Sequence, residues 1–136
     1  MKKNDSNINS PQVLGSWGEL FDKITILQIK LENLTSKNAL NNVGREFKQL
    51  QSILIKYFPN SIEAKQLEEE LKQINQQLWD IEDNIRDKER NRSFDDEFIQ
   101  LARSVYIIND ERSRIKRKIN DIFGSCLLYT SDAADE

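Results

Sequence analysis

Two long stripes of apolar residues constrain the fold of this chain more than any other feature of its sequence. Within each stripe the apolar residues recur three or four positions apart, which is the period of one face of an α-helix. The first stripe consists of Leu67, Leu71, Ile74, Leu78, Ile81 and Ile85. The second consists of Phe98, Leu101, Val105, Ile108, Ile115, Ile119 and Ile122, with Arg112 occupying one of its positions. Because only a few residues near Asn91 separate the stripes, they predict a long antiparallel helical hairpin with arms of ~40–45 Å.

Two shorter helices are predicted ahead of this hairpin. Ser16 and Glu19 match the S-x-x-E capping box that opens a helix. The apolar stripe that follows is Leu20, Ile24, Leu27, Leu31 and Leu34. The Asn-rich stretch from Ser36 to Asn42 predicts a loop, after which a second stripe runs through Val43, Phe47, Leu50, Leu54 and Tyr57.

The ends of the helices carry their own signals. Pro59 stops the second helix, and either Asn60 or Ser61 caps the third. The fourth helix is expected to begin at Ser93 and to end at Gly124. The predicted fold is therefore all-α, an antiparallel four-helix bundle in which the third and fourth helices form the long hairpin.

Length and composition predict one helical domain at residues 16–125, preceded by a disordered N-terminal segment at 1–15. The chain has 136 residues, of which 38% are hydrophobic and 32% charged, a balance typical of a small helical domain. No apolar run has the ~18–20 residues needed to cross a bilayer, and a cytoplasmic location is expected. With no histidine and a single cysteine, Cys126, the sequence excludes Cys/His zinc sites, Ser-His-Asp triads and disulfide frameworks.

The C-terminal tail, Cys126–Glu136, resembles a translated sequencing adapter, in which case it is an artefact. The alternative is an ordinary C-terminal extension. The tail holds three of the 23 acidic residues, so without it 20 acids balance the 20 basic residues and the formal charge of −3 becomes zero.

Arg112 breaks the apolar pattern of the fourth helix. A guanidinium inside a core needs an acceptor, because an unpaired buried charge costs several kcal/mol. We expect a core ion pair with Glu69, Glu70 or a carboxylate of the first helix. The alternative is that Arg112 lies at the edge of the bundle and extends to water.

Three polar groups are predicted to converge on one binding site. On the third helix Trp79, Asp83 and Arg86 share a face, because they are four and three residues apart. The group on the fourth helix is Arg103, Tyr106, Asn109 and Asp110, and the group on the first is Glu19, Asp22 and Lys23. Aromatic rings mixed with arginines and carboxylates are typical of polar pockets, although surface ion pairs are the alternative.

No catalytic residue, metal site or cofactor is predicted. A basic run lies near the end of the fourth helix: Arg112, Arg114, Lys116, Arg117 and Lys118. Cations near a helix C-terminus interact favourably with the helix dipole. Since no aromatic residues are interleaved with this run, nucleic acid is not the expected partner.

The same residues carry a resemblance to a small bacterial, all-helical family of unknown function. Residues 16–27, SWGELFDKITIL, resemble its opening signature S-x-G-E-L-x-D-K-I-T-I-L. The resemblance continues at residues 78–83 with 85–86, at 101–106 with 109–110 and at 116–120, and closes at Gly124-Ser125. It implies a protein with no agreed catalytic residues, encoded near genes for glycosyl transfer and surface polysaccharide.

The leading functional hypothesis is a non-catalytic accessory or binding protein, linked through the resemblance to cell-surface polysaccharide assembly. One alternative is an all-α, carboxylate- and Mg²⁺-dependent enzyme acting on a phosphorylated or nucleotide-sugar substrate, with Glu19, Asp22, Asp80 and Asp83 as ligands. The other is a helix-pairing scaffold, because the regular stripes allow a protein partner or a homo-oligomer.

Overall fold

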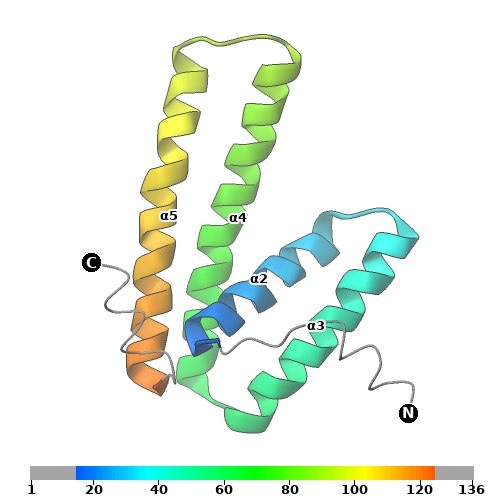
Figure 1. Cartoon of the computed structure of the whole chain (residues 1–136), viewed down its shortest axis with the longest axis vertical. Helices are drawn as coiled ribbons and strands as arrows, with labels where there is room; N and C mark the ends of the chain where they lie inside the picture. Colours follow the sequence, from blue (N-terminus) through cyan, green and yellow to red (C-terminus); the bar gives the residue numbers. More distant parts are fainter. Residues whose placement is uncertain (1–14, 125–136) are drawn as a thin grey trace.

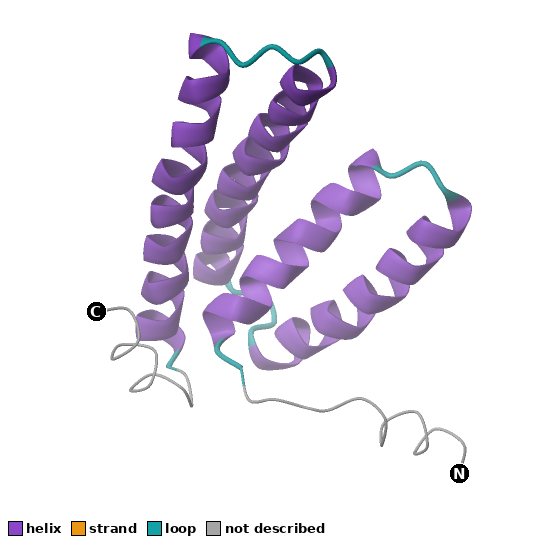
Figure 2. Cartoon of the chain, turned by 45° about the horizontal axis from the view of Figure 1, so that its top comes forward, coloured by secondary structure: helices purple, strands orange, loops and turns teal. Residues whose placement is uncertain are grey.

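The computed structural model describes residues 15–124, which form four helices and, within that range, no strand. They are α2 (Trp17–Asn33), α3 (Lys37–Tyr57), α4 (Ile62–Arg90) and α5 (Asp96–Phe123). The predicted all-α, four-helix fold is confirmed (Figures 1 and 2). The predictions made for the N-terminal segment and for the tail at Cys126–Glu136 fall outside the described residues, apart from Gly15.

Each helix begins at a side chain that caps its free backbone N–H groups. Ser16, Ser36, Ser61 and Asp95 accept a hydrogen bond from the backbone nitrogen three residues further on. Such caps each stabilise a helix by ~1 kcal/mol. Helix α5 begins at Asp96, three residues after the predicted start at Ser93, because the side chain of Asp95 caps it.

The loop predicted from Ser36 to Asn42 is wrong, because α3 already begins at Lys37. Ser36 is the cap, with Oγ 3.4 Å from the backbone nitrogen of Ala39. The apolar stripe of α3 starts earlier than predicted, since Ala39 and Leu40 are half-buried ahead of Val43. Packing of these residues outweighs the weak helix propensity of the asparagines between them.

The helices form two hairpins that meet along α2. Helices α4 and α5 make the long hairpin, and α2 crosses its lower half, with α3 on the far side of α2 (Figures 1 and 2). Helix α2 packs against all three others. The core lies at these crossings and consists of Phe21, Ile24, Leu54, Ala64, Leu67, Leu71 and Ile119.

The upper half of the hairpin packs differently. There, α4 and α5 face only each other among the described helices (Figure 1), and the seam residues Ile81, Ile85, Leu101 and Val105 are half-buried. None of the helices in residues 15–124 has an apolar stretch long enough to cross a membrane.

Candidate functional site

The first turn of α2 lies very close to α5, and Gly18 makes this approach possible. The backbone nitrogen of Gly18 donates a hydrogen bond of 2.8 Å to Oδ1 of Asn120, and both residues are buried. A Cβ at position 18 would lie 2.5 Å from the backbone oxygen of Lys116. No side chain larger than hydrogen therefore fits between the two helices at this level.

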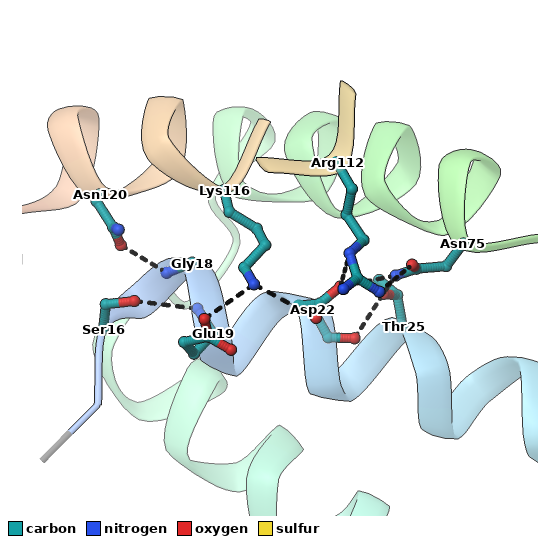
Figure 3. Close-up of polar contacts among 9 residues, drawn as sticks. All are labelled: Ser16, Gly18, Glu19, Asp22, Thr25, Asn75, Arg112, Lys116 and Asn120. Carbon is teal, nitrogen blue, oxygen red and sulfur yellow. Dashed lines mark hydrogen bonds and ion pairs between the residues drawn. The ribbon is translucent and has the colours of Figure 1, made fainter. Parts of the chain in front are cut away.

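One turn further along α2, the buried carboxylate of Asp22 lies between α4 and α5 (Figure 3). Nδ2 of Asn75, on α4, donates 2.9 Å hydrogen bonds to Oδ1 of Asp22 and to Oγ1 of Thr25. The Thr25 hydroxyl in turn donates to the backbone oxygen of Asp22 over 2.8 Å. Asn75 thus ties the charged group of α2 to the middle of α4.

Two cations of α5 flank Asp22. Nε of Arg112 lies 3.9 Å from Oδ1, and Nζ of Lys116 lies 3.8 Å from Oδ2. Lys116 also approaches the exposed Glu19, with Nζ 2.8 Å from Oε2. A buried carboxylate needs such compensation, because removal of a charge from water costs several kcal/mol. The arrangement places a negative group in the interior and the cations around it.

Arg112 is fixed on one side and reaches open space on the other. Its NH1 donates to Oδ1 of Asn75 over 3.4 Å, while its side chain is 30% exposed. The accessible part lines a cleft of about 350 Å³ between α2, α4 and α5. The polar side chains of this cleft are Lys30, Asn75, Trp79, Glu82, Asn109 and Arg112, and Ile26, Ile29 and Leu78 supply its apolar part. We call it the Arg112 cleft.

The structure brings four of the sequence-predicted site residues to two neighbouring places. Glu19 and Asp22 meet at Lys116, whereas Trp79 and Asn109 join Arg112 in the cleft.

The remaining predicted residues lie on outer surfaces of the helices. Lys23 points toward α3, where its Nζ is 3.5 Å from Oε2 of Glu46. Asp83 and Arg86 form an exposed ion pair of 3.1 Å along α4. Arg103, Tyr106 and Asp110 are exposed on α5.

Sequence reasoning did not assign several residues to this site: Gly18, Thr25, Asn75, Lys116 and Asn120. Of these, Lys116 was considered only as part of the basic run near the end of the fourth helix. A signal existed for Asn75, which lies four residues after Leu71 and three before Leu78 and so falls on the buried face of α4. Lys116 likewise follows Arg112 by four residues and shares its face. For Asn75 and Lys116 the signal was the same: a polar side chain on a helix face that the spacing predicts to be buried.

A smaller cavity of about 230 Å³ lies between α2, α3 and α4, lined by Gln28, Gln51, Lys65, Glu68, Glu69 and Lys72. Burial raises the pKa of the Glu68 carboxyl from its ordinary value of 4.5, and the 3.1 Å hydrogen bond that Gln28 Nε2 donates to it partly offsets this effect. Across residues 15–124, no three acidic, histidine or cysteine side chains gather closely enough to hold a metal ion.

Comparison with known protein families shows which family this chain belongs to. A family model described as a family of unknown function (DUF6165) matches residues 12–132, which is most of the chain and includes every residue of the site. The chain belongs to this family. The matched DUF6165 range reaches into the tail at Cys126–Glu136. Neither a curated protein nor a solved structure matches the sequence.

Proposed function

We propose that this DUF6165 protein is a non-catalytic binding protein that holds a small, anionic, ring-containing molecule in the Arg112 cleft. The observation that carries the proposal is the placement of the Arg112 guanidinium. Asp22 and Asn75 contact its Nε and NH1 atoms, and Arg112 also lines the cleft that contains the ring of Trp79.

The donors of Arg112 suit an anion. A guanidinium carries five N–H groups in a planar fork that matches the oxygens of a carboxylate or phosphate. The contacts to Asp22 and Asn75 engage Nε and NH1, so NH2 has no hydrogen-bond partner within residues 15–124. Lys30, on α2, adds a second cation to the cleft wall.

The other side chains of the cleft suit the rest of such a ligand. Trp79 offers a flat apolar face for a sugar or base, while Glu82 and Asn109 offer groups that bind hydroxyls or amides. A volume of about 350 Å³ is at the lower end of the range for small-molecule sites. These features favour a phosphorylated sugar or the sugar-phosphate part of a nucleotide sugar.

The family resemblance supports this ligand class. A protein encoded near genes for glycosyl transfer and surface polysaccharide encounters phosphorylated sugars and nucleotide sugars. We therefore propose an accessory role in cell-surface polysaccharide assembly, in which the protein binds such a molecule without transforming it.

The test is a thermal-shift panel of nucleotides, nucleotide sugars and phosphosugars, followed by calorimetric titration of any hit. A ligand at 100 times its dissociation constant adds ~2.7 kcal/mol to the free energy of unfolding, which raises Tm by several degrees. Arg112→Gln is expected to weaken binding at least ~10-fold, since charge-assisted hydrogen bonds contribute ~1.5–3 kcal/mol. Trp79→Leu removes the flat aromatic face and is expected to weaken binding several-fold, since aromatic contacts contribute ~0.5–1.5 kcal/mol.

Arg114→Gln is the matched control, because Arg114 is exposed on the same helix and pairs with Glu111 outside the cleft. It should bind as the wild type does. Absence of a shift with every member of the panel would overturn the proposal, as would a hit whose affinity is unchanged by both cleft variants.

A further inference from the structure

The outer face of α5 is a surface that the Arg112 cleft does not use. Its residues recur at intervals of four, three, four, four and three: Ile99, Arg103, Tyr106, Asp110, Arg114 and Arg117. This spacing keeps them on one side of the helix. All six residues are exposed, and α5 lies at one edge of the four described helices (Figures 1 and 2).

Large apolar side chains stand exposed on this face and, in the case of Ile107, directly beside it. The exposed fractions are 51% for Ile99, 56% for Tyr106 and 53% for Ile107. Isolated exposed apolar residues are common on proteins. Three within nine positions of one helix, bordered by charges of both signs, are typical of a contact surface.

The order of the charges identifies the partner. In two antiparallel helices related by a two-fold axis, residues whose numbers add to the same sum lie at the same level. With the axis between Tyr106 and Ile107, Arg103 lies level with Asp110 of a second copy, and Asp110 with the second copy's Arg103. The same register sets Asp96 level with Arg117 of the second copy.

The apolar residues agree with this register. Tyr106 of each copy lies level with Ile107 of the other at the centre of the contact, and Ile99 lies level with the aliphatic stem of Arg114. A parallel alignment would instead set Arg103 against Arg103 and Asp110 against Asp110, which is repulsive. The sequence of this face is therefore complementary to itself in one orientation.

We propose that a second copy of this chain binds to the outer face of α5, forming an antiparallel α5–α5 homodimer centred on Tyr106 and Ile107. The contact uses one helix face per copy and is rich in charge, so the dimer dissociates readily and weakens as salt is added. The Arg112 cleft is lined by α2, α4 and α5 together, whereas the proposed contact uses only exposed residues of α5 that do not line the cleft.

Sedimentation equilibrium of the full chain tests the proposal, with reductant present because Cys126 could otherwise form a disulfide between copies. The wild type should show a concentration-dependent mass that shifts toward monomer at high salt. Arg103→Glu sets like charges opposite each other twice per dimer, and so does Asp110→Arg. Each variant should raise the dimer dissociation constant at least ~10-fold.

Mixing the two variants provides the decisive observation. In the mixed dimer the carboxylate introduced at position 103 faces the guanidinium introduced at position 110, and the native Asp110 faces the native Arg103. Dimerisation should therefore return in the mixture although each variant alone is monomeric. Arg45→Glu is the control: Arg45 is exposed on α3, on the far side of α2 from α5, and its reversal should leave the dimer intact.

Three outcomes would overturn the proposal. One is a wild type that stays monomeric at the highest concentration and lowest salt. The second is a dimer that survives both single reversals, since its interface would lie elsewhere. The third is a mixture of the two variants that remains monomeric. Far-ultraviolet circular dichroism confirms that each variant is folded, which the exposure of both positions favours.

Discussion

Replacing Gly18 with alanine tests whether the close approach of α2 and α5 holds the domain together. The added Cβ would lie 2.5 Å from the backbone oxygen of Lys116 and 3.1 Å from Oδ1 of Asn120. The Asn120 side chain can rotate away, but the Lys116 oxygen belongs to the backbone of α5. Relief therefore requires the two helices to move apart, which lengthens the bond from Gly18 to Asn120.

Three contributions set the size of the effect. Alanine is a better helix former than glycine, which stabilises the variant by ~1 kcal/mol. Overpacking a tight contact costs ~1–3 kcal/mol, and leaving a buried amide without its acceptor costs ~1–3 kcal/mol. We expect a net loss of ~2–3 kcal/mol in the free energy of unfolding, equivalent to a fall in Tm of ~10 °C in a domain of this size.

Gly44 provides the matched control. It lies inside α3, where a Cβ would meet only Cδ2 of Leu31 at an ordinary 3.9 Å. Gly44→Ala should therefore stabilise the protein by up to ~1 kcal/mol, because the helix-propensity gain is unopposed. Urea denaturation followed by circular dichroism measures both variants. Equal stabilisation by the two substitutions would refute the reasoning.

Two further predictions concern buried charge. Asp22→Ala should lower the free energy of unfolding by ~2–4 kcal/mol, because Asn75 and two cations lose their shared acceptor. The control, Glu19→Ala, removes an exposed partner of Lys116 and should lower it by under ~1 kcal/mol. Equal losses in urea denaturation would contradict the assignment of Asp22 as the buried acceptor of this site. Burial raises the pKa of Glu68, so the folded state favours its protonated form, and the stability associated with this group is present below the ordinary value of 4.5 and lost as pH rises above it. Glu68→Gln should accordingly melt close to the wild type at low pH and above it at pH 7, and a difference in Tm that does not change with pH would argue against this cause.

Most of the fold could be predicted because it follows from local patterns. The stripes of α4 and α5, Pro59 after α3 and the cap at Ser16 all act within a few residues, and the helices begin and end near the predicted positions. The exception is the start of α3. There the Asn-rich composition indicated a loop, whereas the decisive factors were the Ser36 cap and the packing of Leu40.

The site was harder to predict because it depends on which faces of distant helices meet. Arg112 could be identified as needing an acceptor, and the structure places the carboxylate of Asp22 beside it. Nothing in the sequence around Asn75 or Asn120 shows that α2 crosses the hairpin at those levels. The expected convergence of Asp83, Arg86 and Arg103 with the first helix stays a prediction. In the structure Asp83 and Arg86 pair with each other along α4, and Arg103 is exposed on α5.

The central place of α2 has a consequence for how the protein is made. Gly18 and Asn120 are 102 residues apart in sequence, and the core that includes Phe21 and Ile24 needs Ile119 from the last turns of α5. As the ribosome releases the chain from its N-terminus, α2 emerges before the other described helices, but its binding surface is complete only when α4 and α5 have been synthesised as well. The local α4–α5 hairpin can form on its own contacts, whereas contacts between distant segments form slowly. Of the four described helices, the one that is synthesised earliest is thus the last to be fully packed, and until then its apolar face is exposed to chaperones and to other chains.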